Sequence, residues 1–275
     1  MPEGPEIRRA ADKLAAAIAG QGLRHLWFGL PQLRRFEATL LNSSVVGVNT
    51  KGKALLTEFA CGLTVYSHNQ LYGRWFIMPA GTRPETNRQL RWAIETRRHA
   101  ALLYSASEIT VIPTDELLQH PFLAKAGLDV LSDRPTLAAL QAFVRQDKFQ
   151  RRALGSLLLD QGFIAGTGNY LRSEILFCAG LAPERKLGGL TAAESRRLAQ
   201  QILTITRRAY RTGGITNDAA RVRALRARGW SFGRVRHYVF SRAGQPCHRC
   251  GTVIRKDVVA GRRLYRCPEC QGSAE

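Results

Sequence analysis

Residues 247–250 read Cys-His-Arg-Cys and residues 267–270 read Cys-Pro-Glu-Cys, so two Cys-x2-Cys pairs stand sixteen residues apart. Four thiols with this spacing are typical of a zinc ribbon, in which two short knuckles hold one tetrahedral Zn²⁺. Four thiolates fill the coordination sphere and leave no position for a substrate, so we expect the zinc ion to be structural. The predicted ligands of this ion are Cys247, Cys250, Cys267 and Cys270, in a ribbon over residues 237–271.

The hundred residues before the ribbon have the pattern of a helical domain. Apolar residues recur at helical spacing, and a capping box from Thr191 to Glu194 marks the start of the longest helix. We predict a helical domain over 136–236, which ends in a segment rich in Gly and Arg, and a linker over 128–135. The predicted helices cover 136–146, 152–161, 170–179, 191–211 and 219–227.

The first part of the chain has a different pattern. Residues 5–19 have the spacing of an amphipathic helix with Pro5 in its first turn. From residue 23 to about 112, short β-rich runs alternate with turn residues, which favours an antiparallel sandwich or barrel. We therefore predict an α+β protein of several domains, the first over 1–127. Its strands are expected near 26–29, 45–49, 55–59, 63–67, 75–78, 90–96 and 101–105.

The charge balance restricts the partners. Forty-one Lys and Arg against 21 Asp and Glu give a formal charge of +20, which favours nucleic acid over a membrane surface; the alternative is a generally basic protein. The sequence contains no run of about 20 apolar residues that could span a membrane. Charges near the N-terminus exclude a signal peptide, so we expect a cytosolic protein with reduced thiols, in which Cys61 and Cys178 are buried.

Met1-Pro2 suggests a chemistry that needs no side chain. Removal of Met1 would leave the secondary amine of Pro2 at the N-terminus, a nucleophile that attacks an aldehyde to give a cationic iminium. The iminium acidifies the neighbouring carbon, so β-elimination follows, and Glu3 offers a carboxyl group for proton transfer. The alternative is an ordinary disordered terminus.

Several motifs in this order carry a specific resemblance. They are the N-terminal hexapeptide MPEGPE, a lysine within KGKALL at 51–56, SHNQLYG at 67–73, LDQGFIAGTGNYLRSEIL at 159–176, and the ribbon. Together they resemble the formamidopyrimidine-DNA glycosylase/endonuclease VIII family of base-excision repair enzymes over nearly the whole chain. The hexapeptide and the Asn-Gln-Leu-Tyr loop are most similar to bacterial endonuclease VIII, the branch that acts on oxidised pyrimidines.

The resemblance implies both a fold and an activity. The fold is a β-sandwich with a leading helix, followed by a helical domain with a helix–two-turns–helix motif and the zinc finger. The activity is that of a bifunctional DNA glycosylase and AP lyase on damaged double-stranded DNA. Pro2 would attack C1′, expel the base and form a Schiff base, with β,δ-elimination and Glu3 as the acid/base partner. We expect a monomer in the bacterial cytoplasm, associated with the nucleoid.

The resemblance also assigns roles to residues that bind phosphates. Lys53 would bind the phosphate beside the lesion and support catalysis; by itself it reads as a solvated lysine at the end of a strand. Asn169 and the amides that follow Gly166 and Gly168 would hold a phosphate, whereas spacing alone suggests a plain helix–helix turn. Arg262 in the ribbon would bridge phosphates around the everted nucleotide and aid elimination.

Gln70, Leu71 and Tyr72 would fill the space that the extruded base leaves in the duplex. The competing interpretation places Leu71 and Tyr72 in the core.

Two further alternatives remain open. Residues 212–236 depart from the endonuclease VIII pattern in length and arginine content, and 213–218 could cover a flipped base as a loop does in the purine-directed branch. The same chemistry on oxidised purines is therefore the first alternative. The second is a non-enzymatic zinc-ribbon DNA-binding protein, in which Met1-Pro2 is accidental.

Overall fold

The computed structural model describes residues 2–272, and its contacts divide the chain into two compact units, 1–126 and 127–275. We call them unit 1 and unit 2 and describe each by itself. Of the segment predicted as a linker, Leu128 bridges to Ile164 and Val130 is buried, both within unit 2. The domain boundaries given above stay predictions.

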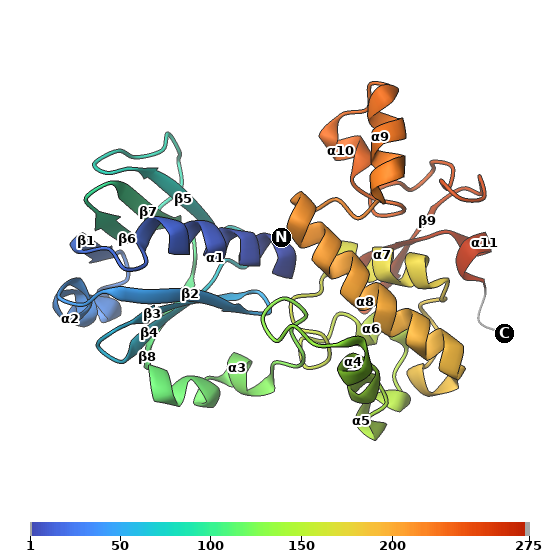
Figure 1. The fold of residues 1–275 in the computed structure, drawn as a ribbon, viewed down its shortest axis with the longest axis horizontal. Helices are drawn as coiled ribbons and strands as arrows, with labels where there is room; N and C mark the ends of the chain where they lie inside the picture. The colour runs from blue at the N-terminus through green and yellow to red at the C-terminus, as the bar shows by residue number, and fades with distance from the viewer. Residues whose placement is uncertain (1, 273–275) are drawn as a thin grey trace. The chain divides into compact units, whose positions relative to one another are not determined.

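Unit 1 is the predicted antiparallel sandwich with a leading helix (Figure 1). One sheet has the order β1-β6-β7-β5 and the other the order β2-β3-β4-β8, and every neighbouring pair is antiparallel. Helix α1 spans Gly4–Ile18. The strands are β1 Leu23–Phe28, β2 Val45–Lys51, β3 Ala54–Phe59, β4 Leu63–His68, β5 Arg74–Pro79, β6 Leu90–Thr96, β7 His99–Tyr104 and β8 Glu108–Pro113.

The core of unit 1 lies between the sheets and α1. The helix buries its apolar residues at helical spacing, among them Ile7, Ala11 and Leu14, against side chains from both sheets. Phe28 and Trp92 stack with ring centroids 5.5 Å apart in the same cluster. This packing fixes where α1 begins, and therefore where the N-terminal residues lie in unit 1.

The sequence pattern missed several elements of unit 1. Strand β8 was not separated from the preceding run, and the short helices η1 Pro31–Phe36, α2 Glu37–Leu41, η2 Thr114–Gln119 and α3 Pro121–Lys125 were not expected. Helices of five or six residues contain too few turns to show a period of 3.6. The prediction for Cys61 was also wrong, because this residue is exposed in the turn between β3 and β4.

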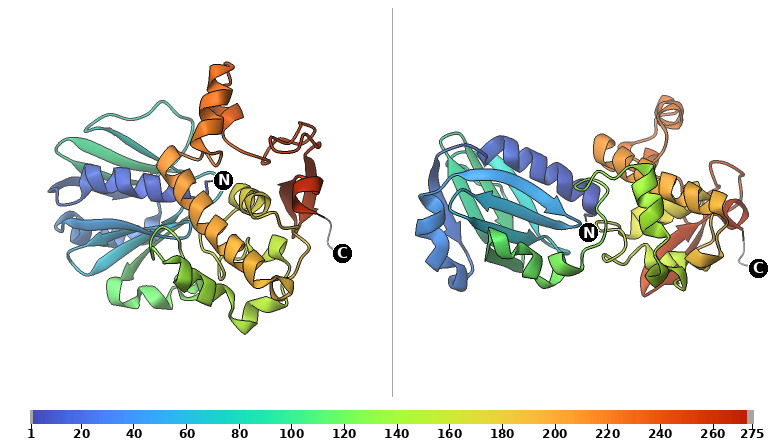
Figure 2. Two further views of the ribbon diagram at one scale, coloured as in Figure 1. Left: turned by 45° about the vertical axis from the view of Figure 1, so that its right-hand side comes forward. Right: turned by 60° about the horizontal axis from the view of Figure 1, so that its bottom comes forward.

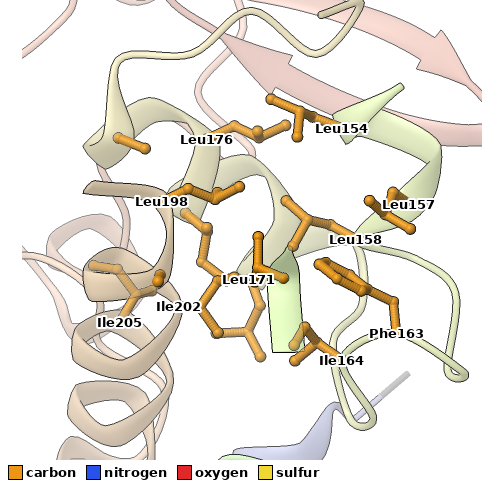
Figure 3. Close-up of a cluster of buried hydrophobic side chains, with 14 of the residues drawn as sticks. Leu154, Leu157, Leu158, Phe163, Ile164, Leu171, Leu176, Leu198, Ile202 and Ile205 are labelled. Atoms are coloured by element: carbon orange, nitrogen blue, oxygen red, sulfur yellow. The ribbon is translucent and has the colours of Figure 1, made fainter. Parts of the chain in front are cut away.

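Unit 2 is helical up to the ribbon. Its helices pack around a core in which Leu171 lies among Leu198 and Ile202 on one side and Leu158 and Phe163 on the other (Figure 3). The Thr191–Glu194 capping box is present at the start of α8. The helices are α4 Leu137–Val144, α5 Asp147–Gln150, α6 Leu154–Leu157, α7 Asn169–Ala179, η3 Leu187–Gly189, α8 Ala192–Thr212, α9 Ala219–Ala227 and α10 Phe232–Val235.

The predicted helix over 152–161 was wrong in length, because only Leu154–Leu157 is helical. The amides of Leu154 and Gly155 bond instead to the carbonyls of Arg185 and Pro183. Beyond Leu157 the chain continues in i→i−3 turns, with the amide of Asp160 bonded to the carbonyl of Leu157. These turns join α6 to α7 and form the helix–two-turns–helix motif.

The ribbon follows as a hairpin and a short helix: β9 Arg255–Val259, β10 Arg262–Arg266 and α11 Pro268–Gln271. Ala260 and Gly261 connect the strands with φ of 52° and 68°, the backbone of a tight two-residue turn. The predicted α+β class is thus confirmed. No helix within residues 2–272 is long and apolar enough to cross a membrane.

Candidate functional site

The N-terminal residues are fixed by the start of α1. Glu3 is the N-cap of the helix and is 4% exposed, and its backbone amide donates to Glu6 Oε2 at 3.0 Å in a capping box. Pro2, directly before this cap, is half-buried; Met1 lies outside the described residues. The backbone of Glu3, directly after Pro2, is therefore held by hydrogen bonds to the first turn of α1.

Lys53 lies in the two-residue turn between β2 and β3, after Gly52 with φ of 61°. This turn lies beside the first turn of α1 in both figures of the whole chain (Figures 1 and 2). Lys53 is half-buried, and its charge contributes to lowering the pKa of His68, after the larger effect of burial. A cation therefore lies at the same end of the sandwich as Pro2 and Glu3.

The loop between β4 and β5 presents Gln70, Leu71 and Tyr72 to solvent. Leu71 is 61% exposed and Tyr72 is 69% exposed, which excludes the interpretation of these two residues as core. Two large apolar side chains on one exposed turn have no role in the packing of unit 1. They are available to a partner with flat apolar faces.

In unit 2, the turn before α7 is rigid. Gly166 has a φ of 90°, and the side-chain amide of Gln161 accepts from the Gly166 amide and donates to the Thr167 carbonyl. Gly168 is the N-cap, so Asn169 is the first residue of the helix and is half-buried. Backbone amides at such a helix start, together with the Asn169 side chain, suit an anion.

Arg172 was missed by the sequence reasoning, although it links α7 to the ribbon. It is fully buried, and its guanidinium donates to the carbonyls of Gly155, Val259, Arg262 and Arg263 at 2.9 to 3.2 Å. A charged residue among the apolar residues of this helix was the signal that could have identified it, because such residues are buried only with partners.

Arg262 is held through its backbone and exposed at its side chain. It is the first residue of β10 and pairs with Val259, and its carbonyl accepts from Arg172. The hydroxyl of Ser173 donates to the Asn169 carbonyl and accepts from the Tyr265 amide. Asn169 and Arg262 are thus brought into one hydrogen-bonded assembly within unit 2.

Glu174 is a second buried charge that the sequence reasoning missed. Its carboxylate accepts from the backbone amides of Tyr238, Val239 and Phe240 at 2.8 to 2.9 Å, and from the hydroxyl of Thr216. These contacts attach two segments to α7: the start of the ribbon and the segment that follows α8.

That 213–218 covers a flipped base stays a prediction, and within unit 2 this segment is largely buried. Ile215, Thr216 and Asn217 are buried, and the Thr216 amide bonds to the Arg236 carbonyl. The following α9 and α10 (Figures 1 and 2) contact the ribbon, because Arg221 donates to the His248 carbonyl and the Trp230 ring lies 5.9 Å from the His248 ring. The exposed arginines of this part are Arg223, Arg226, Arg228 and Arg234.

The four cysteines of the ribbon form the predicted cluster, with all sulfur atoms within 4.8 Å of one another. The Cys250–Cys267 and Cys247–Cys270 sulfur pairs are 3.4 and 3.9 Å apart. Tetrahedral zinc with Zn–S bonds of about 2.3 Å requires sulfur atoms about 3.8 Å apart. The residues therefore fit one structural zinc ion, and the closed ligand set leaves it no role at a substrate.

Of the other predicted residues, Pro2, Glu3, Lys53 and the 70–72 loop belong to unit 1, and Asn169 and Arg262 belong to unit 2.

Comparison with known proteins places the chain in one family. The formamidopyrimidine-DNA glycosylase N-terminal domain matches residues 1–106, and the H2TH domain of the same enzymes matches 127–220. The zinc finger found in FPG and IleRS matches 244–272. "Endonuclease 8" of Enterobacter sp. (strain 638) is 47% identical, and that of Klebsiella pneumoniae subsp. pneumoniae is 46% identical. Each alignment spans 271 residues, 98% of this chain and 100% of the relative.

Solved structures support the fold. Lactococcus lactis formamidopyrimidine-DNA glycosylase bound to AP-site DNA is similar with a TM-score of 0.79 and 22% identity over 98% of this chain and all of that chain. The same enzyme with DNA containing an oxidised pyrimidine gives 0.80 and 22% identity over 99% of this chain and all of that chain. At this identity the similarity establishes the fold alone.

Proposed function

The chain belongs to the formamidopyrimidine-DNA glycosylase/endonuclease VIII family, DNA glycosylases of base-excision repair with AP lyase activity, and from this premise we propose that it removes oxidised pyrimidines from duplex DNA through a Schiff base on Pro2. The observation that carries the proposal is the ordered N-terminus, in which a buried Glu3 caps α1 directly behind Pro2. A catalytic amine needs such fixed placement, because proximity and orientation supply a large part of the rate.

The chemistry follows from the amine. The Pro2 nitrogen attacks C1′ of the damaged nucleotide, the bond from C1′ to the base breaks, and the base leaves with a proton. The sugar ring then opens with proton transfer to O4′, for which Glu3 supplies the acid, and the iminium forms at C1′. Loss of a C2′ proton expels the 3′-phosphate, and a second elimination expels the 5′-phosphate.

Cations and amides from both units bind the phosphates in this proposal. Lys53 binds the phosphate beside the lesion, and its place in the turn between β2 and β3, half-buried, supports that role. In unit 2, Asn169 with the amides at the start of α7, and Arg262 on the ribbon hairpin, bind the backbone of the same DNA. The zinc ion keeps the hairpin folded and takes no part in a reaction step.

The exposed 70–72 loop supports pyrimidine lesions as the substrate. Leu71 and Tyr72 wedge into the duplex and stack on the neighbouring bases, while Gln70 hydrogen-bonds the orphan base. This loop and the N-terminal hexapeptide are the parts of the chain that resemble endonuclease VIII within the family, and the relatives at 46–47% identity carry the name Endonuclease 8.

The experiment that tests the substrate class compares excision from matched duplexes. Each contains dihydrouracil, thymine glycol, 8-oxoguanine or formamidopyrimidine at one position. The proposal expects kcat/KM for the two pyrimidines to exceed that for the two purines by at least tenfold. Equal or higher rates on the purines would show that the substrate assignment is wrong and leave the lyase chemistry intact.

A further duplex of the same sequence with one abasic site separates the enzyme from a non-enzymatic DNA-binding protein. Protein that starts at Pro2 should cut every duplex that contains an abasic site, whereas protein that retains a blocked N-terminus should bind the duplex without cutting it. Binding without cutting by both forms would support the DNA-binding alternative.

A further inference from the structure

The loop that carries Gln70, Leu71 and Tyr72 is built before any DNA is present. The Gly73 amide donates to the Asn69 carbonyl at 2.7 Å and closes a tight turn. A Cβ at position 73 would lie 2.6 Å from the Asn69 backbone, so only glycine fits there. The guanidinium of Arg88 donates to the Tyr72 carbonyl from the segment before β6. Hydrogen bonds therefore hold the loop of residues 69–73 in place before DNA binds.

Gln70 is held in a backbone conformation that it rarely adopts. Its φ is 48°, in the left-handed region, which costs a non-glycine residue about 1 kcal/mol or more. The backbone amide of Gln70 donates to His68 Nδ1 at 3.0 Å. Burial lowers the pKa of His68, so at neutral pH the ring is uncharged and Nδ1 can accept this bond.

The side chain of Gln70 has a separate partner. Its Nε2 donates to Glu108 Oε2 at 2.7 Å, and the other Glu108 oxygen accepts from the Tyr66 hydroxyl at 3.2 Å. Glu108 is the first residue of β8 and pairs with His68 across the strands. The glutamine is exposed, yet its amide is anchored to a carboxylate that is itself fixed by the sheet.

This contact also determines which end of the amide faces the carboxylate. An ionised carboxylate only accepts hydrogen bonds, so it binds the nitrogen of the Gln70 amide and cannot bind its oxygen. The amide is therefore not free to rotate, and Oε1 is fixed on the side away from Glu108. The loop offers an incoming base a carbonyl oxygen, while one of its two N–H groups is already used.

We propose that Glu108 is a positioning residue that fixes the Gln70 amide and thereby makes the enzyme prefer guanine over adenine as the base opposite the lesion. The proposal deepens the proposed function, because it rests on the role of Gln70 at the orphan base. The Watson–Crick edge of guanine has adjacent N1–H and N2–H donors for one carbonyl oxygen. Adenine offers one donor and one acceptor, and it binds glutamine best through both the oxygen and the nitrogen of the amide.

Substitution of Glu108 should therefore change the preference for guanine over adenine as the opposite base. In Glu108→Gln the partner can both donate and accept, so the Gln70 amide can turn either way. In Glu108→Ala the amide has no partner on the sheet. Either substitution frees the nitrogen of Gln70 for adenine, so affinity for DNA with adenine opposite the lesion rises relative to guanine.

The test is a binding measurement, which does not depend on catalysis. It uses duplexes with a tetrahydrofuran abasic analogue opposite guanine or adenine, and the matching single strand without an opposite base. Wild-type protein should bind the guanine duplex about tenfold more tightly, as expected for one hydrogen bond of about 1.4 kcal/mol. Glu108→Gln should bring the ratio of the two Kd values close to one and leave the single-strand Kd unchanged.

Two controls separate positioning from general damage to the site. Glu116→Gln removes an exposed carboxylate of the same unit and should preserve the ratio. In a Gln70→Ala background, Glu108→Gln should have no further effect on the ratio, because the amide that it positions is gone.

Three results would overturn the proposal: equal wild-type affinities for the two duplexes, an unchanged ratio in Glu108→Gln, or an equal loss of affinity on all three DNAs. Failure to excise pyrimidine lesions would refute the proposed substrate and leave these binding ratios fully interpretable.

Discussion

Replacement of Arg172 by Met tests whether the ribbon hairpin is positioned by α7. Arg172 is fully buried and donates to four backbone carbonyls, three of them in the hairpin, at 2.9 to 3.2 Å. A net contribution of about 1 kcal/mol for each bond gives about 4 kcal/mol for the set. Methionine has a similar length and is apolar, so it fills the space and leaves the four carbonyls without this donor.

The assay is amide hydrogen exchange of the zinc-loaded chain, read by mass spectrometry for peptides that cover β9, β10 and α7. A loss of about 4 kcal/mol corresponds to an increase of about a thousandfold in the exchange of protected hairpin amides. Peptides from the sandwich should keep their rates. The variant should also bind abasic duplex more weakly, because Arg262 and Asn169 are no longer held together.

Arg196→Met is the matched control, since Arg196 is exposed on α8 and its loss should change exchange by less than about threefold. Unchanged protection of β9 and β10 in Arg172→Met would refute the reasoning. So would equal acceleration in both units, because that result would indicate general destabilisation.

Three further predictions follow from local features. Removal of zinc by a strong chelator under reducing conditions should unfold residues 247–271, and the amides there should lose their protection from hydrogen exchange. Affinity for abasic duplex should fall at least tenfold. Retained protection of these amides would contradict a structural metal. Burial lowers the pKa of His237 to about 3, so below the unfolded value of 6.5 the unfolded chain takes up a proton that folded His237 does not. His237 should then contribute a loss of about 1.4 kcal/mol to the free energy of urea unfolding of unit 2 between pH 7.5 and 5.5; His237→Phe should reduce the total loss by that amount, and exposed His25→Gln should leave it unchanged. Gly73→Ala, which brings a Cβ to 2.6 Å from the Asn69 backbone, should weaken binding of abasic duplex at least tenfold and leave single-strand binding unchanged; equal loss on both would show that the turn does not serve the duplex.

Much of the fold could be predicted because its signals are local. Amphipathic spacing gave α1, and the capping box gave the start of α8. The cysteine spacing gave the zinc ribbon, since four ligands of one ion leave few alternatives. The β-rich runs gave the sandwich, because many short runs between turn residues are typical of antiparallel strands.

The elements that were missed depend on contacts distant in sequence. The predicted helix at 152–161 has helical spacing, but the amides of Leu154 and Gly155 bond to residues near 184 that no local pattern reveals. Arg172 and Glu174 stand in a stretch quoted for its resemblance, and their roles depend on carbonyls and amides about 65 to 90 residues away.

The same limit applies to the site in unit 1. The resemblance identified Gln70, but nothing in the local sequence indicates that Glu108, on a strand 38 residues later, holds its amide. Cys61 shows the converse error, because its apolar neighbours suggested burial while the turn between β3 and β4 exposes it. Roles that depend on cross-strand register require the structure.

The central claim is that the Pro2 amine forms a covalent intermediate with the damaged sugar. Its most direct test is borohydride trapping on duplexes that contain one dihydrouracil or thymine glycol, with protein confirmed to start at Pro2 and with protein whose N-terminus is blocked. The account predicts a trapped complex that peptide mapping places on Pro2 and that the block abolishes. A complex that maps to a lysine, or that survives the block, would contradict it.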